Sequence, residues 1–357
     1  MSTIVVSAHY DTFSAAPGLP GGGNGSGIVA LMALMRHFSA LYKDPATRPN
    51  MNLLFLLTGG GGIDFFGLKA WLKTAEMRVL DSVEFFISLD TLSGMETEPE
   101  LYLHYSKPPK DAVVSNWYSR FEKAAALEEI KLSTVHKKIN LALPFMAWEH
   151  EHVAQSKILG VTLSGQGQGG NPMVRSSVVD GPAFVDRVAL TKAIGVVGNA
   201  ISMRLFEEEG RKFPVFAASH RIPVTGSAFL DKWLLSLGQV PRMSPFLSLE
   251  DPFSAAVMQF FDERTDKSTR SSVKMNPAFV FYDGISFSMG AYNAAGVLFD
   301  LLLIMAVTLY LLLLFAALKI ITQGWQAFLT IFGSPDKRWK KAKSGRKGEK
   351  PQSSAKK

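Results

Sequence analysis

The chain contains no cysteine, which excludes a disulfide scaffold, a CxxC redox site and a zinc site built from thiolates. Three motifs of nucleotide and hydrolase chemistry are also absent, namely GxxxxGK[ST], GxSxG and HEXXH. The glycine-rich residues 21–27 do not fit a GxGxxG register, and we interpret them as a turn before a helix capped by Asn24 or Ser26. Phosphate binding and serine hydrolysis are therefore not supported.

The net positive charge of the chain is confined to the C-terminal tail. Residues 334–357 carry ten lysines and arginines against Asp336 and Glu349, so the tail more than accounts for the formal net charge of +7. A nucleic-acid surface would place Lys and Arg on the folded domain, so we expect no nucleic-acid partner. A basic run beside a membrane span is explained by topology and by anionic lipid headgroups.

One long hydrophobic run is present. Residues 301–318 read LLLIMAVTLYLLLLFAAL without a charge, between Asp300 and Lys319. Such a run is long enough to cross the hydrocarbon core of a bilayer as a helix. We predict one transmembrane helix over residues 297–321 and a basic tail over residues 322–357. Because flanks rich in Lys and Arg stay in the cytosol, we expect the large N-terminal domain on the other side of the membrane.

The start of the chain conflicts with that topology. Met1 to Thr3 lead directly into the apolar residues 4–6, without the basic segment or the cleavage site of a secretory leader. A chain whose only hydrophobic segment comes late would insert tail-first and leave its domain in the cytosol. We expect that the natural N-terminus is absent from this sequence. A tail-anchored cytosolic protein is the alternative.

Apolar strands alternate with helical patterns over the N-terminal part of the chain. Strands are predicted at residues 4–9, 52–58, 83–90 and 158–164, and helices after residue 27, from residue 65, and over residues 111–130 and 185–203. Continuous apolar strands separated by helices indicate a parallel sheet covered on both faces. We predict an α/β domain over residues 1–206. Residues 207–296, with two short apolar stretches at 229–237 and 255–261, are predicted to form an extension or membrane-proximal segment.

A polar pair stands at the predicted carboxyl end of the first strand, where ligands bind in open α/β sheets. His9 and Asp11 have the HxD spacing, in which a carboxylate can orient a metal-binding imidazole. A polar pair that only ends a strand explains this spacing equally well.

Longer stretches resemble the zinc aminopeptidase fold that is shared with transferrin-receptor and nicastrin-type ectodomains. They are VVSAHYD from Val5, the GNGSG turn at 23–27, NLLFLLTGG from Asn52 and SLDT from Ser88. The resemblance implies a three-layer α/β/α domain with a mainly parallel sheet, whose N-terminal strands are missing from this chain. It also implies two zinc positions and a glutamate that activates the bridging water.

Only part of that set of residues is present. His9 and Asp90 match metal-ligand positions, and Asp11 matches the orienting carboxylate. Glycine stands where the bridging aspartate, the Glu-Glu pair and the late histidine would be: Gly23, Gly61, Gly62 and Gly165. Without a bridge and a base, two cations are not held and water is not deprotonated. We therefore expect no catalytic residue, metal or cofactor. The alternative is a zinc aminopeptidase or carboxypeptidase with displaced ligands, using His9, Asp90 and Asp64.

Two further features resemble functional sites. Residues 149–152 (EHEH) suggest a metal site, but successive residues of a helix point roughly 100° apart. We expect His150 and Glu151 to cap or pair with neighbouring elements instead. Asn24 begins a formal glycosylation sequon, which we expect to be poorly used.

Several stretches resemble a non-catalytic, nicastrin-like branch of the same family. They are LHYSKPP from Leu103, STVHKKINLA from Ser133, AWEHE from Ala147 and FVFYD from Phe279. The resemblance implies a single-pass protein of the endoplasmic reticulum membrane, with a lumenal pseudopeptidase domain that acts as a scaffold. The implied partners are the large nodal modulator protein, a small multi-pass membrane protein and the translocon. The implied function is to assist the biogenesis of multi-pass membrane proteins, with a link to Nodal signalling. A partner's span could approach the transmembrane helix at its small residues Ala306, Thr308, Ala316 and Ala317.

Overall fold

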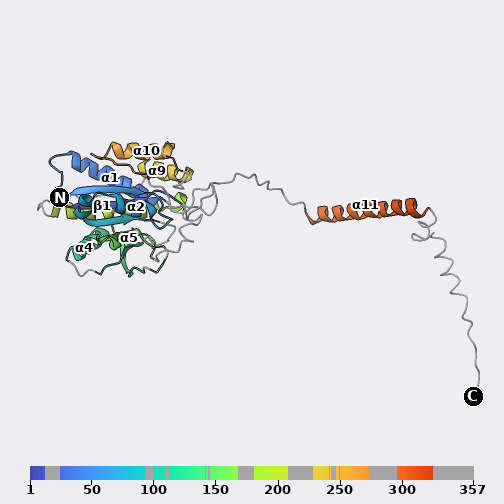
Figure 1. Ribbon diagram of the computed structural model, residues 1–357, viewed down its shortest axis with the longest axis horizontal. Helices are drawn as coiled ribbons and strands as arrows, with labels where there is room; N and C mark the ends of the chain where they lie inside the picture. The colour runs from blue at the N-terminus through green and yellow to red at the C-terminus, as the bar shows by residue number, and fades with distance from the viewer. Residues whose placement is uncertain are drawn as a thin grey trace, which may run out of the picture. The chain divides into compact units, whose positions relative to one another are not determined.

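The chain divides into two compact units, Met1–Ile285 and Ser286–Lys357. The computed structural model describes residues 1–12, 25–93, 100–108, 112–140, 142–143, 145–167, 181–207, 228–240, 242, 247–248, 250–272 and 296–324. The first unit contains a six-stranded sheet, and the second contains one long helix (Figure 1).

The sheet of the first unit has the strand order β2-β1-β3-β6-β4-β5. Its strands are β1 (Thr3–His9), β2 (Asn52–Thr58), β3 (Val83–Leu89), β4 (Glu100–Tyr105), β5 (Lys131–His136) and β6 (Gly160–Ser164). Neighbouring strands run parallel except for β4 and β6, which are antiparallel. The predicted α/β class with a mainly parallel sheet is confirmed. The strands β1, β2, β3 and β6 are parallel, so their carboxyl ends lie side by side at the same end of the strands.

Two of these strands were not predicted from the sequence. β4 (ELYLHY) and β5 (KLSTVH) mix polar with apolar residues instead of forming continuous apolar runs. Alternation is the pattern of a strand with one exposed face, and β5 lies at the edge of the sheet. The prediction relied on fully apolar runs and therefore found only the more buried strands.

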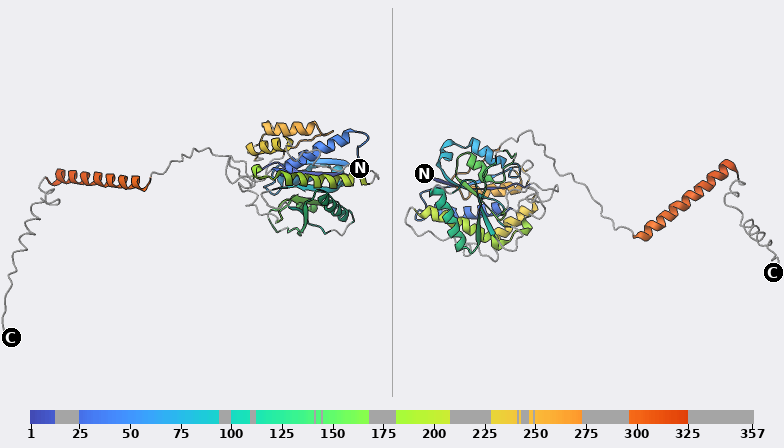
Figure 2. Two further views of the ribbon diagram at one scale, coloured as in Figure 1. Left: turned by 180° about the vertical axis from the view of Figure 1, so that it is seen from behind. Right: turned by 90° about the horizontal axis from the view of Figure 1, so that it is seen from below.

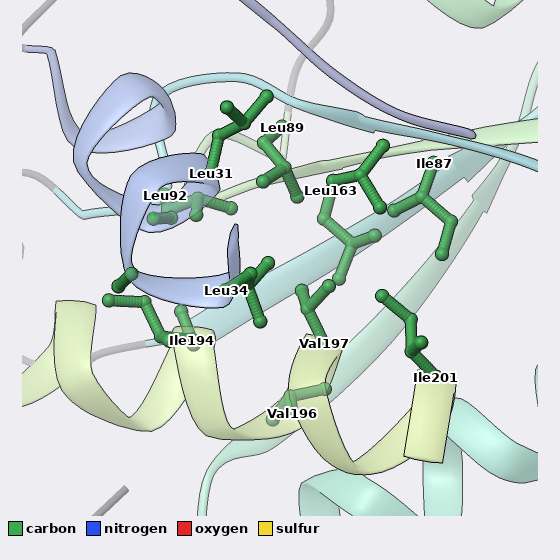
Figure 3. Close-up of a cluster of buried hydrophobic side chains, with 14 of the residues drawn as sticks. Leu31, Leu34, Ile87, Leu89, Leu92, Leu163, Ile194, Val196, Val197 and Ile201 are labelled. Carbon is green, nitrogen blue, oxygen red and sulfur yellow. The ribbon is translucent and has the colours of Figure 1, made fainter. Parts of the chain in front are cut away.

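Helices cover both faces of the sheet, and alternate residues of β1, β2 and β3 belong to different cores. Along β1, Ile4, Val6 and Ala8 join the larger core, whereas Val5 joins the smaller one. The larger core includes residues of α1 (Ser26–Lys43), α4 (Ala112–Leu127) and α7 (Arg187–Glu207), and Figure 3 shows side chains of α1 and α7 packed against β3 and β6. The smaller core includes residues of α2 (Phe66–Thr74) and α5 (Glu149–Gln155). A short helix α3 (Met77–Ser82) precedes β3, and the 3₁₀ helix η1 (Pro182–Phe184) precedes α7.

Two helices from the C-terminal part of the first unit lie beside α1 (Figures 1 and 2). They are α9 (Ala228–Gln239) and α10 (Pro252–Asp262). Leu234 and Phe260 are buried and belong to the larger core. The apolar stretches at 229–237 and 255–261 are therefore the buried stripes of two amphipathic helices.

Two of the described helices are long and apolar enough to cross a membrane, Arg187–Phe206 and Val297–Thr322. The first is most of α7, whose side chains are largely buried in the core of the domain. The second lies within α11 (Val297–Gln323), whose apolar side chains are exposed. A long apolar helix near the C-terminus is thus confirmed, and it indicates a single-pass membrane protein.

Candidate functional site

The ends of β1 and β3 bring His9 and Asp90 together. The two strands pair in register with Ser7 opposite Ser88, so the residues that follow them meet at the carboxyl edge of the sheet. His9 Nε2 lies 3.4 Å from Asp90 Oδ1, and His9 Nδ1 lies 3.2 Å from the carbonyl oxygen of Asp11. Both ring nitrogens therefore contact an oxygen atom of the protein.

The Asp11 carboxylate connects the end of β1 to the loop that follows β2. Its Oδ1 accepts a hydrogen bond from the backbone N–H of Gly61 at 2.9 Å and lies 3.8 Å from His9 Nδ1. A buried arginine that sequence reasoning missed, Arg242, holds the same segment. Its Nη1 donates to the carbonyl oxygen of Tyr10 at 2.7 Å, and its own carbonyl accepts the N–H of Thr12 at 2.9 Å.

Position 61 admits no side chain while the His9 ring keeps its place. A Cβ atom built on Gly61 would overlap the imidazole ring of His9. A glutamate at this position would therefore require the ring to move. The other glycines at expected ligand positions are less informative. Gly62 is exposed, Gly165 donates its N–H to the carbonyl of Thr91 at 2.6 Å, and Gly23 lies outside the described residues.

A glutamate that sequence reasoning did not assign to this site, Glu149, lies on the same face of the sheet. It is the first residue of α5 and is 1% exposed. Ser7 Oγ donates to Glu149 Oε1 at 2.9 Å, and Ser88 Oγ donates to Oε2 at 2.6 Å. Thr58 Oγ1 of β2 lies 3.5 Å from Oε1. One carboxylate thus ties α5 to three neighbouring strands.

The sequence of the strands, and not the EHEH run itself, could have predicted a polar partner such as Glu149. Ser7, Thr58 and Ser88 are buried polar residues in mainly apolar strands, and alternation along β1 and β3 puts Ser7 and Ser88 on the face opposite the larger core. Buried hydroxyls require a partner, so these serines predict a polar group above this part of the sheet.

The carboxylates around His9 favour its charged form. Burial lowers the pKa of His9, but the hydrogen bond to Asp90 and the charges of Asp90, Asp11 and Glu149 together raise the pKa to about 9. Burial raises the pKa of Asp11 and of Glu149, against the opposing effect of the His9 charge. The carboxylates around His9 thus favour its protonated form.

His150 pairs with neighbouring elements and Glu151 caps the start of α5, as predicted for these two residues. His150 Nδ1 lies 2.9 Å from Thr162 Oγ1, and its Nε2 lies 3.0 Å from Ser106 Oγ. Glu151 Oε2 accepts the backbone N–H of Ala147 at 3.3 Å. These side chains fix α5 in place.

Asp64, the third ligand of the alternative zinc site, is bound in a different cluster. Its Oδ1 accepts the N–H of Met146 at 2.7 Å and lies 2.9 Å from His152 Nε2, while its Oδ2 pairs with Lys69 at 2.6 Å. Within the described ranges, no three His, Cys, Asp or Glu side chains are arranged to hold a metal ion. Since zinc takes four ligands, the donors around His9 do not fit this ion.

The expected capping role of Ser26 is wrong. The N-cap of α1 is Gly25, in a left-handed conformation (φ 74°) and without a side-chain capping bond. Ser26 Oγ instead accepts the backbone N–H of Leu92 at 2.9 Å. A tertiary contact with the loop after β3 has replaced the local one. Asn24, the other candidate cap and the sequon residue, lies outside the described residues.

Comparison with known proteins defines the class. Residues 1–156 match Peptidase family M28. The fold is similar to the crystal structure of the gamma-secretase component nicastrin, with a TM-score of 0.51 and 12% identity, over 72% of this chain and 52% of that chain. The first unit is therefore an M28 aminopeptidase-like α/β domain.

The chain is more specifically a homologue of nicalin. It is 32% identical over 336 residues to "BOS complex subunit NCLN" of Canis lupus familiaris, and 33% identical over 336 residues to the protein of that name in Homo sapiens. It is 31% identical over 218 residues to "Nicalin" of Caenorhabditis elegans. The dog and human matches cover 89% of this chain but 58% of each relative, and the nematode match covers 56% and 38%. The chain thus spans little more than half the length of the mammalian relatives.

Proposed function

We propose that this chain is a non-catalytic subunit of a membrane protein complex of the endoplasmic reticulum. The observation that carries the proposal is the place of the His9 ring. It lies directly against Gly61, where the zinc aminopeptidases that the chain resembles carry a carboxylate. Its Nδ1 lies 3.2 Å from the backbone carbonyl oxygen of Asp11, and its Nε2 lies 3.4 Å from Asp90 Oδ1.

The buried polar residues of this site act in the proposal as structural connections. Glu149 accepts hydrogen bonds from Ser7 and Ser88 and is 1% exposed, so in the proposal it holds α5 on the sheet. The pKa of His9 is raised to about 9, which favours its protonated form. The proposal therefore assigns neither group the role of a general base and assigns the domain a binding function.

The partners are proposed from the nicalin relationship. We expect this chain to assemble with a nodal modulator protein and a small multi-pass membrane protein, beside the translocon. There the complex would assist the insertion of multi-pass membrane proteins and would account for the link to Nodal signalling. The domain would be lumenal and the basic tail cytosolic.

The helix α11 would pack against a partner's spans in this complex. Asp300 and Lys319 lie near its ends, and no charge lies between them, so association within the bilayer depends on shape and packing. Ala306 and Ala317 are eleven residues apart, about three helical turns, and so share one face. Val307 lies on a different face and provides a control.

The test is purification of the full protein, tagged at its chromosomal locus, from membranes in a mild detergent. We expect the nodal modulator protein and the small multi-pass protein to co-purify, with no stoichiometric zinc and no peptide hydrolysis. Replacing Ala306 and Ala317 together with leucine should reduce recovery of the partners several-fold, whereas Val307→Leu should not. One zinc ion per chain that survives dialysis, with hydrolysis that a chelator abolishes, would instead establish the peptidase.

A further inference from the structure

Tyr310 places a hydroxyl group in the middle of the apolar helix α11. It lies nine residues after Leu301 and eight residues before Leu318, the two ends of the uncharged run. At a rise of 1.5 Å per residue, its Cα is roughly 12–14 Å from either end of that run. The hydrocarbon core of a bilayer is about 30 Å thick, so this depth is close to the midplane. Tyrosine is normally enriched at the two membrane interfaces and not at this depth.

The hydroxyl of Tyr310 has no acceptor in the part of the chain that the structure describes. Two polar residues, Thr308 and Tyr310, stand between Asp300 and Lys319. Thr308 is satisfied within the helix, because its Oγ1 donates to the carbonyl oxygen of Ile304 at 2.7 Å. The Tyr310 side chain is 63% exposed on the surface of α11. Its rigid ring carries the hydroxyl away from the backbone, so the helix does not supply an acceptor in the same way.

Within the bilayer, only protein can provide the missing acceptor. Acyl chains contain no hydrogen-bonding atom, water is scarce in the hydrocarbon core, and an unpaired polar group there costs free energy. The tyrosine side chain is shorter than the distance from its Cα to either interface, so its hydroxyl does not reach the headgroups. The acceptor must therefore belong to another transmembrane segment at the same depth. Because an ionised group is costly at this depth, a neutral oxygen is expected, such as that of Ser, Thr, Asn or Gln.

Tyr310 shares a helix face with the small residues Ala306 and Ala317. Ala306 comes four residues before Tyr310 and Ala317 seven residues after it. At about 100° per residue, both lie within roughly 40° of Tyr310 around the helix axis. Small residues allow a neighbouring helix to approach closely. A helix packed on this face would therefore lie within reach of the hydroxyl, so the alanines and the unpaired donor indicate the same face independently.

A second copy of this chain does not meet the requirement. Packed through the same face, it would bring its own Tyr310 to this depth, and one of the two hydroxyl protons would still lack an acceptor. Thr308, the other hydroxyl of the run, lies two residues before Tyr310 and so points roughly 160° away from it. The acceptor is therefore expected on a different protein.

We propose that Tyr310 donates a hydrogen bond to a neutral oxygen on the transmembrane helix of a different protein, which packs on the face of Ala306 and Ala317. The bond fixes the depth and the rotation of the two helices relative to each other, because the other contacts of this face are apolar and do not specify either. The inference rests on the proposed function, since it requires that α11 pack against a partner's span. It adds the donor that selects this partner and the chemistry of the group selected.

The first experiment maps the neighbour of this face by photo-crosslinking of the full protein in its native membranes. The photoreactive residue p-benzoylphenylalanine replaces Leu313, one turn after Tyr310 on the same face, or Leu312, on the opposite face. The cross-linked peptides are identified by mass spectrometry. Position 313 should cross-link to a transmembrane segment of another protein that carries Ser, Thr, Asn or Gln within one turn of the cross-linked residue. Position 312 should not cross-link to that segment.

The second experiment removes the hydroxyl and keeps the ring. Tyr310→Phe should insert into membranes as the wild type does but should reduce recovery of the cross-linked partner in mild detergent by about three- to tenfold. Adding Leu312→Tyr to this variant returns a hydroxyl to the opposite face and should not restore recovery. Replacing the mapped acceptor on the partner should have the same effect as Tyr310→Phe, and combining the two changes should add little further loss.

The outcomes separate this inference from the proposed function. If the partner is recovered equally with Tyr310→Phe, the hydrogen bond is refuted while the scaffold function stands. A cross-link from position 313 to a second copy of the chain, or to lipid alone, would overturn the inference as well. If no partner accompanies the wild-type protein, the proposed function itself is contradicted, and this inference falls with it.

Discussion

At the residue scale, His9 and Gly61 depend on each other. The imidazole ring occupies the space next to the Cα of Gly61, and the N–H of Gly61 bonds to Asp11, which also contacts the ring. The glycine at position 61 and the position of the His9 ring therefore form one structural arrangement. In this arrangement a protonated side chain provides the positive charge that the surrounding carboxylates require.

A substitution at Gly61 tests this dependence. Gly61→Ala should lower the free energy of unfolding by about 1–3 kcal/mol, because the new methyl group overlaps the His9 ring. Gly62→Ala, at an exposed neighbouring position, should change it by less than about 0.5 kcal/mol. Urea denaturation of the full chain in detergent, followed by tryptophan fluorescence, measures both.

The coupling between the two residues provides the control. In the background of His9→Ala the space beside position 61 is free, so Gly61→Ala should cost much less than in the wild type. An equal cost in both backgrounds would show that the ring is not what excludes a side chain.

At the element scale, α5 is a short helix held by polar contacts on its sheet-facing side. Glu149 binds hydroxyls of β1 and β3, and His150 binds Thr162 of β6. Trp148, just before the helix, stacks on His104 of β4 with ring centroids 4.0 Å apart. The helix therefore joins strands that are distant in sequence. Its stability depends on the protonation state of these groups.

The pH dependence of stability should report on His150. Burial, with a smaller effect of His104, lowers the pKa of His150 to about 3. Near pH 6.5 the unfolded chain begins to bind a proton at His150, whereas the folded chain excludes that proton until the pH approaches 3. The free energy of unfolding is therefore unaffected by His150 above pH 6.5, and it decreases as the pH falls from 6.5 towards 3. At its steepest the loss is about 1.4 kcal/mol per pH unit. Urea midpoints measured between pH 7 and pH 5 should therefore fall.

Two variants separate this effect from other titrations. His150→Gln should be less stable than the wild type at pH 7 but should lose less stability on acidification. His136→Gln, which changes an exposed histidine of β5, is the substitution control measured beside it. His9 acts in the opposite direction at higher pH. Because its pKa is raised to about 9, its contribution is present below pH 6.5 and is lost as the pH rises towards 9. An unchanged slope in His150→Gln would contradict the assignment.

At the scale of the whole molecule, a folded α/β unit and a single apolar helix share one chain. The apolar residues of α7 are buried in the domain, while those of α11 are exposed. The bilayer is the environment in which an exposed apolar helix of this length is stable. We expect the basic residues beyond it to orient the helix.

The orientation can be measured in intact microsomes from cells that naturally make the protein. Protease added outside should remove the basic tail and leave the domain protected, since Lys and Arg remain cytosolic. Detergent should make the domain accessible and serves as the control. A domain digested in sealed microsomes would establish the tail-anchored cytosolic arrangement instead.

Local patterns in the sequence determined much of this protein. Four apolar strands, the helices between them, the span at the C-terminus and the glycines at expected ligand positions are all visible in short stretches of residues. Each depends on periodicity, on composition or on the identity of one residue. Neighbouring residues were therefore sufficient to predict the fold class.

Only the tertiary structure decided how the site is built. Ser7 and Glu149 are 142 positions apart, and the contact between Ser88 and Glu149 spans 61. The Ser26 hydroxyl bonds to a loop 66 positions away and not to its own helix. The edge position of β2 likewise follows from strand order and not from its apolar sequence. Such contacts depend on which elements the folded chain places side by side, and no local pattern contains this information.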